Sequence, residues 1–391
     1  MGQRNKPRLQ CIVCGGSSWS PIPDPVIGRA ITTAGLILDQ SLSRGHCRKC
    51  GLGQRINVPF IGQSDFYEKS YAAYYQRAGA AKYDARRYEV MAAWMMSALG
   101  NWTPRTVLDV GCGAGWSMMS TRKIFPNAVI EGIEPSRTNS DIARSHGFLV
   151  HEVKAGQGSN FGRKYDLVYS NNVLMHVTDP VSFLANLEDC LEDGGRIVIV
   201  CPDSSQPSNE LLWCDHNFSF MPDHVRRLAS KVGLTVTHWA ENPDDVTVLN
   251  KQIFVLAKVG VEVVVGRPGA PPLPPDQLFL MRCDYIKGWQ AVNETLGRTV
   301  ASYDRVLNFG SSMWTWLLAA YCPDYWARVD ACLVDGFSGG CIDKEVLPFE
   351  SVKLGSGDCV VLGLNPQTQA AMKARMAGVV DALTWYDLVW I

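Results

Sequence analysis

The sequence has almost no net charge, because 37 Lys and Arg residues are matched by 38 Asp and Glu residues. A protein that binds nucleic acid through many phosphates usually carries a clear basic excess. The chain also lacks any run of about twenty apolar residues, which is the length of a membrane helix. No apolar segment follows Arg4, Lys6 and Arg8, so we expect no signal peptide. These absences predict a cytoplasmic protein that binds neither nucleic acid nor a membrane.

Cysteine is too sparse for a disulfide scaffold, with 13 residues in a chain of 391. Four of them stand in two CxxCG motifs, CIVCG and CRKCG, and are Cys11, Cys14, Cys47 and Cys50. Two such knuckles supply four thiolates in a tetrahedron, which predicts a closed, structural zinc site. The gap between the motifs is longer than usual, but strand-like residues 34–39 and 41–46 can form a ribbon within it. His46 is an alternative ligand, and four unligated thiols are the alternative to a metal.

Residues 106–117, TVLDVGCGAGWS, are the most informative stretch, because an apolar run ends in Asp109 and then breaks into alternating glycines. Gly111, Cys112 and Gly113 begin a loop typical of a buried strand that passes into a helix close to a ligand. The spacing differs from the G-x-G-x-x-G of dinucleotide sites. Asp109 can accept a hydrogen bond from a positively charged amino group. The pattern therefore favours S-adenosylmethionine as the cofactor.

A second strand-like run, residues 128–134, also ends on an acid, and Glu134 is followed by Pro135. A carboxylate at this place can bind both hydroxyls of a ribose. Helix and strand patterns then alternate, with helices over 83–99, 116–125, 139–146, 180–191 and 222–232, and strands over 148–153, 165–169, 196–201 and 234–239. This alternation predicts βαβ units on a parallel sheet, whose ligands lie beyond the carboxyl ends of the strands. We expect residues 252–258 to complete the sheet as an antiparallel strand.

From about residue 71 to 258 the sequence resembles class I S-adenosylmethionine-dependent methyltransferases. Many of them continue from the fourth strand as xxVLEHVxDP, and residues 171–180 read NNVLMHVTDP. The resemblance implies cofactor contacts for Asn171 and Asn172. Met175 replaces the usual glutamate, so any role of that acid is absent. The resemblance also implies that His176 is a structural or cofactor-side residue, with a catalytic role as the alternative.

Two further segments are candidates for the acceptor site. Residues 65–88 are rich in tyrosine, and they form either a lid over the cofactor or amphipathic helices whose rings fill the core; Tyr71, Tyr74 and Tyr75 are the residues of interest. After the fifth strand comes a loop with Asp215 and His216. Histidine titrates near neutral pH, and a neighbouring acid can orient it as a general base. The alternative for His216 is a loop histidine bonded to the backbone.

The C-terminal third begins after a stiff segment, residues 266–275, that holds five prolines. We therefore expect a zinc-binding module at 1–60, a transferase domain at 61–262 with a lid at 61–100, a linker at 263–277 and a smaller α/β domain at 278–391. In that last domain we expect helices at 278–302, 312–322 and 366–377, and strands at 304–309, 329–334, 359–364 and 379–385. Its first strand is followed by one glycine, so a wall for the substrate or an interface is expected there rather than a second nucleotide site.

Zinc knuckles, a transferase core and a smaller α/β tail, in this order, resemble the three-part sugar C-methyltransferases of deoxysugar pathways. That resemblance implies C-methylation of a keto-deoxysugar carried on a nucleoside diphosphate. The family loop Y-H-E-H-x-S-Y-F-S aligns its acid with Asp215 and its basic histidine with His216, whereas Trp213, Cys214 and Ser219 depart from it. O-methylation of a sugar or another small metabolite remains open. So do an RNA-modifying protein and a non-catalytic S-adenosylmethionine-binding protein.

Overall fold

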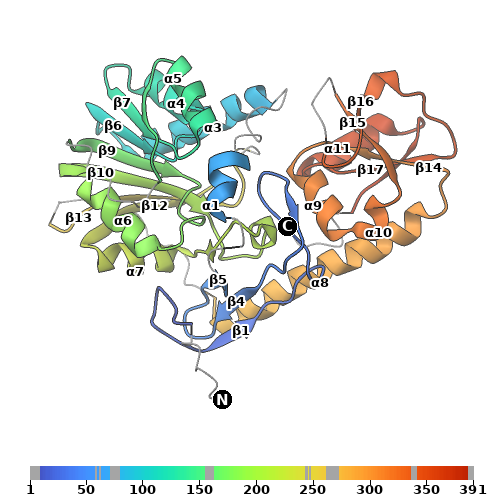
Figure 1. Cartoon of the computed structure of the whole chain (residues 1–391), viewed down its shortest axis with the longest axis horizontal. Helices are drawn as coiled ribbons and strands as arrows, with labels where there is room; N and C mark the ends of the chain where they lie inside the picture. The colour runs from blue at the N-terminus through green and yellow to red at the C-terminus, as the bar shows by residue number, and fades with distance from the viewer. Residues whose placement is uncertain are drawn as a thin grey trace.

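The computed structural model describes residues 9–57, 60, 63–70, 80–154, 163–242, 245, 248–260, 273–335 and 341–385. Figure 1 shows a large sheet unit on the left, a smaller one on the right and the N-terminal module below and between them. Helix α8 (Pro275–Val300) runs from the N-terminal module to the right-hand unit. None of the described helices combines the length and the apolar character needed to cross a membrane.

The large sheet has seven strands in the order β12-β13-β10-β9-β6-β7-β8. Neighbouring strands are parallel, except that β13 is antiparallel to both β10 and β12. The strands are β6 Thr106–Val110, β7 Val129–Ile133, β8 Leu149–His151, β9 Tyr165–Asn171, β10 Leu191–Pro202, β12 Leu234–Glu241 and β13 Lys251–Lys258. The predicted parallel sheet with an antiparallel closing strand is thus confirmed.

Helices cover both faces of this sheet, which explains why its central strands are almost wholly buried. Side chains from α3 (Ala80–Leu99), α4 (Trp116–Ile124) and α5 (Arg137–Ser145) share one core with the sheet. Side chains from α6 (Pro180–Asp189) and α7 (Pro222–Lys231) share the core of the other face. The five predicted helices are all present, and their ends differ from the prediction by three residues or fewer.

The N-terminal module forms a four-stranded sheet, β1-β4-β5-β11, whose last strand comes from the large sheet unit. Its strands are β1 Trp19–Pro21, β4 Arg44–Cys47, β5 Gly53–Arg55 and β11 Phe218–Ser219. A separate hairpin pairs β2 (Ala30–Ile31) with β3 (Ile37–Leu38). The predicted strands 34–39 and 41–46 were wrong in their bounds, because the turn of this hairpin occupies residues 32–36, with Gly35 in the left-handed region at φ 81°.

The smaller unit holds a five-stranded parallel sheet in the order β16-β15-β14-β17-β18. Its strands are β14 Arg305–Phe309, β15 Val329–Val334, β16 Val346–Pro348, β17 Asp358–Leu362 and β18 Asp381–Leu383, and its helices after α8 are α9 Met313–Tyr321, α10 Pro323–Trp326 and α11 Pro366–Met376. The short strand β16 was not predicted. Helix α8 begins at Pro275, inside the expected linker.

Hydrophobic packing joins the three parts. One continuous core contains Ile31 of the hairpin, Trp213 of the large sheet unit and Trp289 of α8, together with much of α9 and part of β17. Before α3 the chain forms α1 (Gln63–Asp65) and a π-helix, Phe66–Ser70. Tyr71, Tyr74 and Tyr75 lie outside the described residues, so the lid hypothesis stays a prediction.

Candidate functional site

The glycine loop after β6 adopts backbone conformations that require glycine. Gly111, Gly113 and Gly115 all lie in the left-handed region, with φ of 82°, 54° and 85°. A Cβ on Gly111 would come 2.4 Å from a methyl group of Val173. The alternating glycines of the sequence therefore produce a tight turn between β6 and α4, in backbone conformations that other residues rarely adopt.

Asp109 is fully buried one residue before the end of β6. Its Oδ2 accepts a hydrogen bond from the Ser117 hydroxyl, whereas Oδ1 has no partner among the described residues. Burial raises the pKa of the Asp109 carboxyl to about 7. A buried carboxylate oxygen without a donor is rare in folded proteins, so this atom fits a ligand that brings a donor, such as an ammonium group. Cys112, in the adjacent loop, is buried.

Glu134 follows β7, and its side chain accepts a hydrogen bond from the glycine loop. Its Oε2 accepts the amide N–H of Gly113 at 3.0 Å, and its Oε1 accepts the amide N–H of Ser136 at 3.0 Å. Each carboxylate oxygen has a further lone pair for a ligand hydroxyl. Burial raises the pKa of Glu134 to about 7. Pro135, the next residue, is half-buried.

Asn171 ends β9, and Asn172 follows it in the left-handed region at φ 57°. The Asn172 amide donates to the carbonyl of Val200 at 2.8 Å, and its side-chain Oδ1 is buried without a partner in the described structure. Since β6 pairs with β7 on one side and β9 on the other, the glycine loop, Glu134 and these asparagines share one sheet edge. The predicted cofactor residues are thus brought together, and their donors and acceptors fit S-adenosylmethionine.

His216 is buried in the loop between β10 and β11, with 4% of its surface exposed. Its Nδ1 lies 3.1 Å from the carbonyl oxygen of Glu210 and 3.9 Å from the Glu210 carboxylate. The acid expected to orient it was Asp215. The structure gives this place to Glu210, which sequence reasoning missed because it lies six residues earlier, at the start of the short helix Asn209–Leu212.

Asp215 turns away from His216, toward the N-terminal hairpin. Its carboxylate accepts the amide N–H of Thr33 at 2.8 Å and the hydroxyl of Thr33 at 2.5 Å. Its Oδ2 also lies 3.6 Å from Nδ1 of His176. The expectation that the adjacent acid orients His216 was therefore wrong, because consecutive side chains of this loop point to different neighbours. The acids and histidines pair crosswise, Glu210 with His216 and Asp215 with His176.

His176 lies beside His216, with ring centroids 4.9 Å apart. Its Nδ1 is 2.8 Å from the carbonyl oxygen of Asp215 and 2.9 Å from the hydroxyl of Tyr67. Burial lowers the pKa of His176 to about 4, so the ring is neutral near pH 7. Tyr67 belongs to the π-helix within the tyrosine-rich segment. The sequence signal for that segment was present, but it did not single out this tyrosine.

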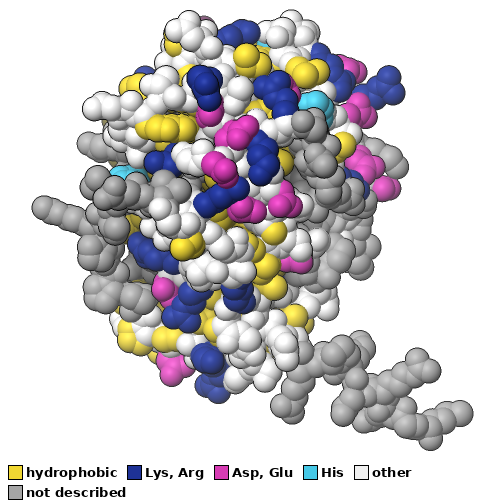
Figure 2. Space-filling view, turned by 90° about the vertical axis from the view of Figure 1, so that its left-hand side faces the viewer, with side chains coloured by type: hydrophobic (Ala, Val, Ile, Leu, Met, Phe, Trp, Pro, Cys, Tyr) yellow, Lys and Arg dark blue, Asp and Glu magenta, His cyan; other side chains and the backbone are white. Residues whose placement is uncertain are grey.

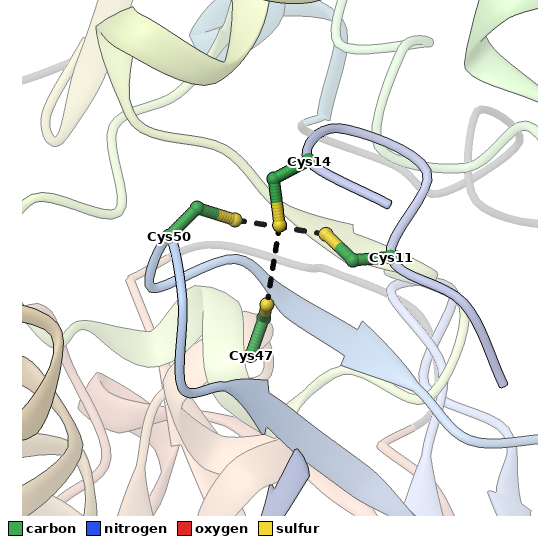
Figure 3. A group of neighbouring side chains, drawn as sticks. All are labelled: Cys11, Cys14, Cys47 and Cys50. Carbon is green, nitrogen blue, oxygen red and sulfur yellow. Dashed lines mark hydrogen bonds between the residues drawn. The ribbon is translucent and has the colours of Figure 1, made fainter. Parts of the chain in front are cut away.

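The four knuckle cysteines converge, as Figure 3 shows. Cys11 and Cys50 have sulfurs 3.6 Å apart, as do Cys14 and Cys47, and all four sulfurs lie within 4.8 Å of one another. Tetrahedral zinc with bonds of about 2.3 Å requires sulfur separations of about 3.8 Å. The four residues could therefore hold one metal ion. His46 is not part of this group, and its Nδ1 lies 2.9 Å from Nη1 of Arg282.

Residues 83–239 match a protein family described as "Methyltransferase domain". Among curated relatives, a malonyl-[acyl-carrier protein] O-methyltransferase of Halalkalibacterium halodurans is 27% identical over 103 residues, 24% of this chain and 38% of that protein. A trans-aconitate 2-methyltransferase of Methylobacterium radiotolerans is 29% identical over 114 residues, 28% of this chain and 43% of that protein. A tRNA U34 carboxymethyltransferase of Alteromonas mediterranea is 33% identical over 106 residues, 24% and 32% of the two chains. The chain spans less than half the length of each.

Solved structures also align with the chain. The CcbJ methyltransferase from Streptomyces caelestis covers 45% of this chain and 89% of its own, with 14% identity and a TM-score of 0.35. A geranyl diphosphate C-methyltransferase from Streptomyces coelicolor covers 43% and 75%, with 16% identity and a TM-score of 0.37. The family match falls on the sheet and the glycine loop described above. Over residues 83–239 the chain therefore carries a methyltransferase domain.

Proposed function

We propose that this chain is an S-adenosylmethionine-dependent methyltransferase whose transferase unit spans residues 61–262. One observation carries the proposal. Within the segment that matches the methyltransferase family, two buried carboxyls, Asp109 and Glu134, stand beside a left-handed glycine loop at one sheet edge. In this proposal Asp109 binds the ammonium group of the cofactor and Glu134 binds its ribose hydroxyls. Cys112, Pro135, Asn171 and Asn172 complete the cofactor pocket.

His216 is the proposed general base. When bound, the cofactor supplies a methyl group on a positive sulfur, which is already reactive toward an electron-rich acceptor. The carbonyl of Glu210, 3.1 Å away, accepts a hydrogen bond from the Nδ1–H group of His216, which leaves Nε2 without a proton and able to remove one from the acceptor. The nearby Glu210 carboxylate stabilises the imidazolium that forms. His176, Tyr74 and Tyr75 remain the alternative proton acceptors, and Asp215 acts on His176.

For the acceptor, we propose a keto-deoxysugar linked to a nucleoside diphosphate and methylated on carbon. The order of zinc knuckles, transferase core and α/β tail supports this assignment, since it resembles the three-part sugar C-methyltransferases. O-methylation of a small metabolite is the second candidate, and the names of O-methyltransferase relatives favour it. Figure 2 shows basic and acidic side chains interspersed on the outer face of the transferase unit, which differs from the basic patch typical of a nucleic-acid-binding face.

The test has two stages. Calorimetry should first show that the chain binds S-adenosylmethionine; an absence of binding would overturn the proposed activity. Methyl-labelled cofactor is then offered with a panel of nucleotide-linked keto-sugars, small carboxylic acids, phenols and tRNA, and products are identified by mass. Label on a sugar carbon supports the first acceptor, label on a hydroxyl or carboxyl oxygen supports the second, and label in tRNA contradicts both.

We also propose that Cys11, Cys14, Cys47 and Cys50 bind one structural zinc ion. The two knuckles support this, because the amides of Gly15 and Gly51 each donate to the carbonyl of the first cysteine at 2.8 Å. The buried apolar residues of the module belong to cores that it shares with the other units, so it has little core of its own. Removal of the metal should therefore unfold it. Elemental analysis of freshly purified protein should find about one equivalent. A value below about half an equivalent would contradict the site.

A further inference from the structure

The hairpin β2–β3 of the N-terminal module reaches the loop that carries Asp215 and His216. Thr33, at its turn, gives both its amide N–H and its hydroxyl to the Asp215 carboxylate. The Cys214 amide donates to the carbonyl of Ile31 at 2.8 Å. Asp215 has no exposed surface, so these contacts are shielded from water. The carboxylate nearest to His176 is therefore held from outside the transferase unit.

The side chain of Arg44, on β4, donates hydrogen bonds to backbone carbonyls of the same loop. It is 2% exposed, and its Nη2 lies 3.3 Å from the carbonyl oxygen of Glu210, 2.8 Å from that of Trp213 and 3.0 Å from that of His216. Three carbonyls on one guanidinium nitrogen fix the path of the loop from Glu210 to His216. A buried cation with such partners is costly to misplace.

The loop then enters the sheet of the N-terminal module. β11 pairs with β5, and the amide of Arg55 donates to the carbonyl of Asn217 at 2.9 Å. Cys47, a proposed zinc ligand, ends β4 three residues after Arg44. The metal site, Arg44 and the loop are thus parts of one small sheet.

We propose that the N-terminal module contributes residues to the acceptor site. Thr33 and Arg44 are positioning residues that hold Asp215 and His216 in place. The proposal rests on the proposed methyl transfer for its consequence on turnover. The proposal also states that Thr33 sets the environment of Asp215 and, through Asp215, that of His176. This part does not depend on catalysis.

The charged and titratable groups around this pair are few. Asp215 faces His176 and lies within electrostatic range of Arg44, Arg55 and Cys214. His176 also faces Tyr67 and His216, with the positive charge of Lys251 acting at longer range. Loss of the Thr33 hydroxyl leaves the Asp215 charge less stabilised, and protonation of His176 is the nearest compensation.

The experiment compares Thr33→Val and Thr33→Ala with Thr33→Ser. Thr32→Val is the matched control, because Thr32 is fully buried and its hydroxyl accepts only the amide of Leu36 in the same hairpin, at 3.1 Å. Ring NMR of the histidine-labelled full chain, with His176 assigned from a His176→Asn spectrum, follows the titration of His176. We expect its pKa to rise in Thr33→Val and Thr33→Ala, and to stay unchanged in Thr33→Ser and Thr32→Val.

Turnover gives the second readout. With the acceptor identified by the labelled assay, kcat should fall about tenfold to a hundredfold in Thr33→Val, the effect of a small misplacement in an active site. The serine variant should recover it, and the KM for S-adenosylmethionine should not change. An unshifted His176 titration in both the valine and alanine variants overturns the positioning role even if the chain methylates. A failure to bind S-adenosylmethionine overturns the proposed function and leaves the titration result standing.

Discussion

The first strands of the large and the small sheet, β6 and β14, have similar sequences but differ in how the polar residue near their ends is bonded. β6 reads TVLDV before Gly111, and β14 reads RVLNF before Gly310, so Asp109 and Asn308 occupy the same place one residue before the strand end. Asp109 keeps one oxygen without a partner in the described structure. Asn308 uses both side-chain atoms: Nδ2 donates to the carbonyl of Gly310 at 2.9 Å, and Oδ1 accepts the hydroxyl of Tyr325 at 3.0 Å.

The turn after β14 is also closed by its neighbours. A Cβ on Gly310 would lie 2.5 Å from the carbonyl oxygen of Gly363, and the hydroxyl of Thr315 donates to that same oxygen at 2.9 Å. After β6 the neighbours are as close at Gly111, so the two turns differ in the unused hydrogen-bonding capacity of Asp109 and not in their packing. The difference teaches that a parallel sheet offers a cofactor site only where its strand ends keep unused hydrogen-bonding capacity.

The largest expected effect is on turnover, and it comes from the loop after β10, which carries the proposed base of the first sheet. His216→Ala should lower turnover by about 10² to 10⁴, the usual contribution of a positioned general base, and leave cofactor affinity nearly unchanged. Steady-state rates and calorimetry check this. His238→Ala, on strand β12, is the control and should keep full turnover. Near-normal turnover of His216→Ala would mean that the proton leaves by another residue, with His176, Tyr74 and Tyr75 the next candidates.

A smaller effect is expected on cofactor affinity. It should distinguish the two acids that follow the second strand of each sheet. Glu134 follows β7, and Asp335 follows β15, where it forms an exposed ion pair with Arg375 at 2.6 Å. Glu134→Ala should weaken S-adenosylmethionine binding by about 1.5 to 3 kcal/mol, the range for a hydrogen bond to a charged group. Asp335→Ala should leave it unchanged. Equal affinities for the two variants would remove the distinction between the sheets.

The smallest expected effect is a pH dependence of folding stability and of cofactor affinity, and it is specific to the first sheet. Burial raises the pKa of Asp109 from 3.8 and of Glu134 from 4.5 to about 7 in each case. The folded, cofactor-free protein therefore holds these protons more tightly than the unfolded chain, and the resulting stability is lost as pH rises through about 7.

A cofactor with a positive ammonium group binds the ionised form of Asp109. Its affinity should therefore rise a few-fold between pH 6 and pH 8, with proton release on binding. Calorimetry in buffers of different ionisation enthalpy measures that release. Asp109→Asn, which resembles the arrangement at Asn308, should remove most of the dependence. A flat affinity profile for the wild-type chain would contradict the role of Asp109.

Much of the fold followed from local pattern. Strand and helix periodicities gave the elements of both parallel sheets, because a buried strand is a short apolar run and an amphipathic helix repeats every 3.6 residues. The glycine loop and the acid after β7 predicted the place of the proposed cofactor site, since the carboxyl ends of neighbouring parallel strands must meet there. The bounds of the hairpin β2–β3 and the short strands β11 and β16 were missed, because two or three residues carry no periodicity.

By itself the sequence determined the strands and helices of the two sheets, the meeting of Asp109 and Glu134 at one sheet edge, and the grouping of four cysteines, because each depends on local spacing. Only the tertiary structure decided which acid faces which histidine. Asp215 is adjacent to His216 in the chain, yet it bonds to Thr33, 182 residues away, and Glu210 takes its expected place. The same holds for Arg44, whose partners lie 166 to 172 residues along the chain. Such pairings arise when separate elements pack together and buried polar groups must find partners, and sequence spacing carries no record of that choice.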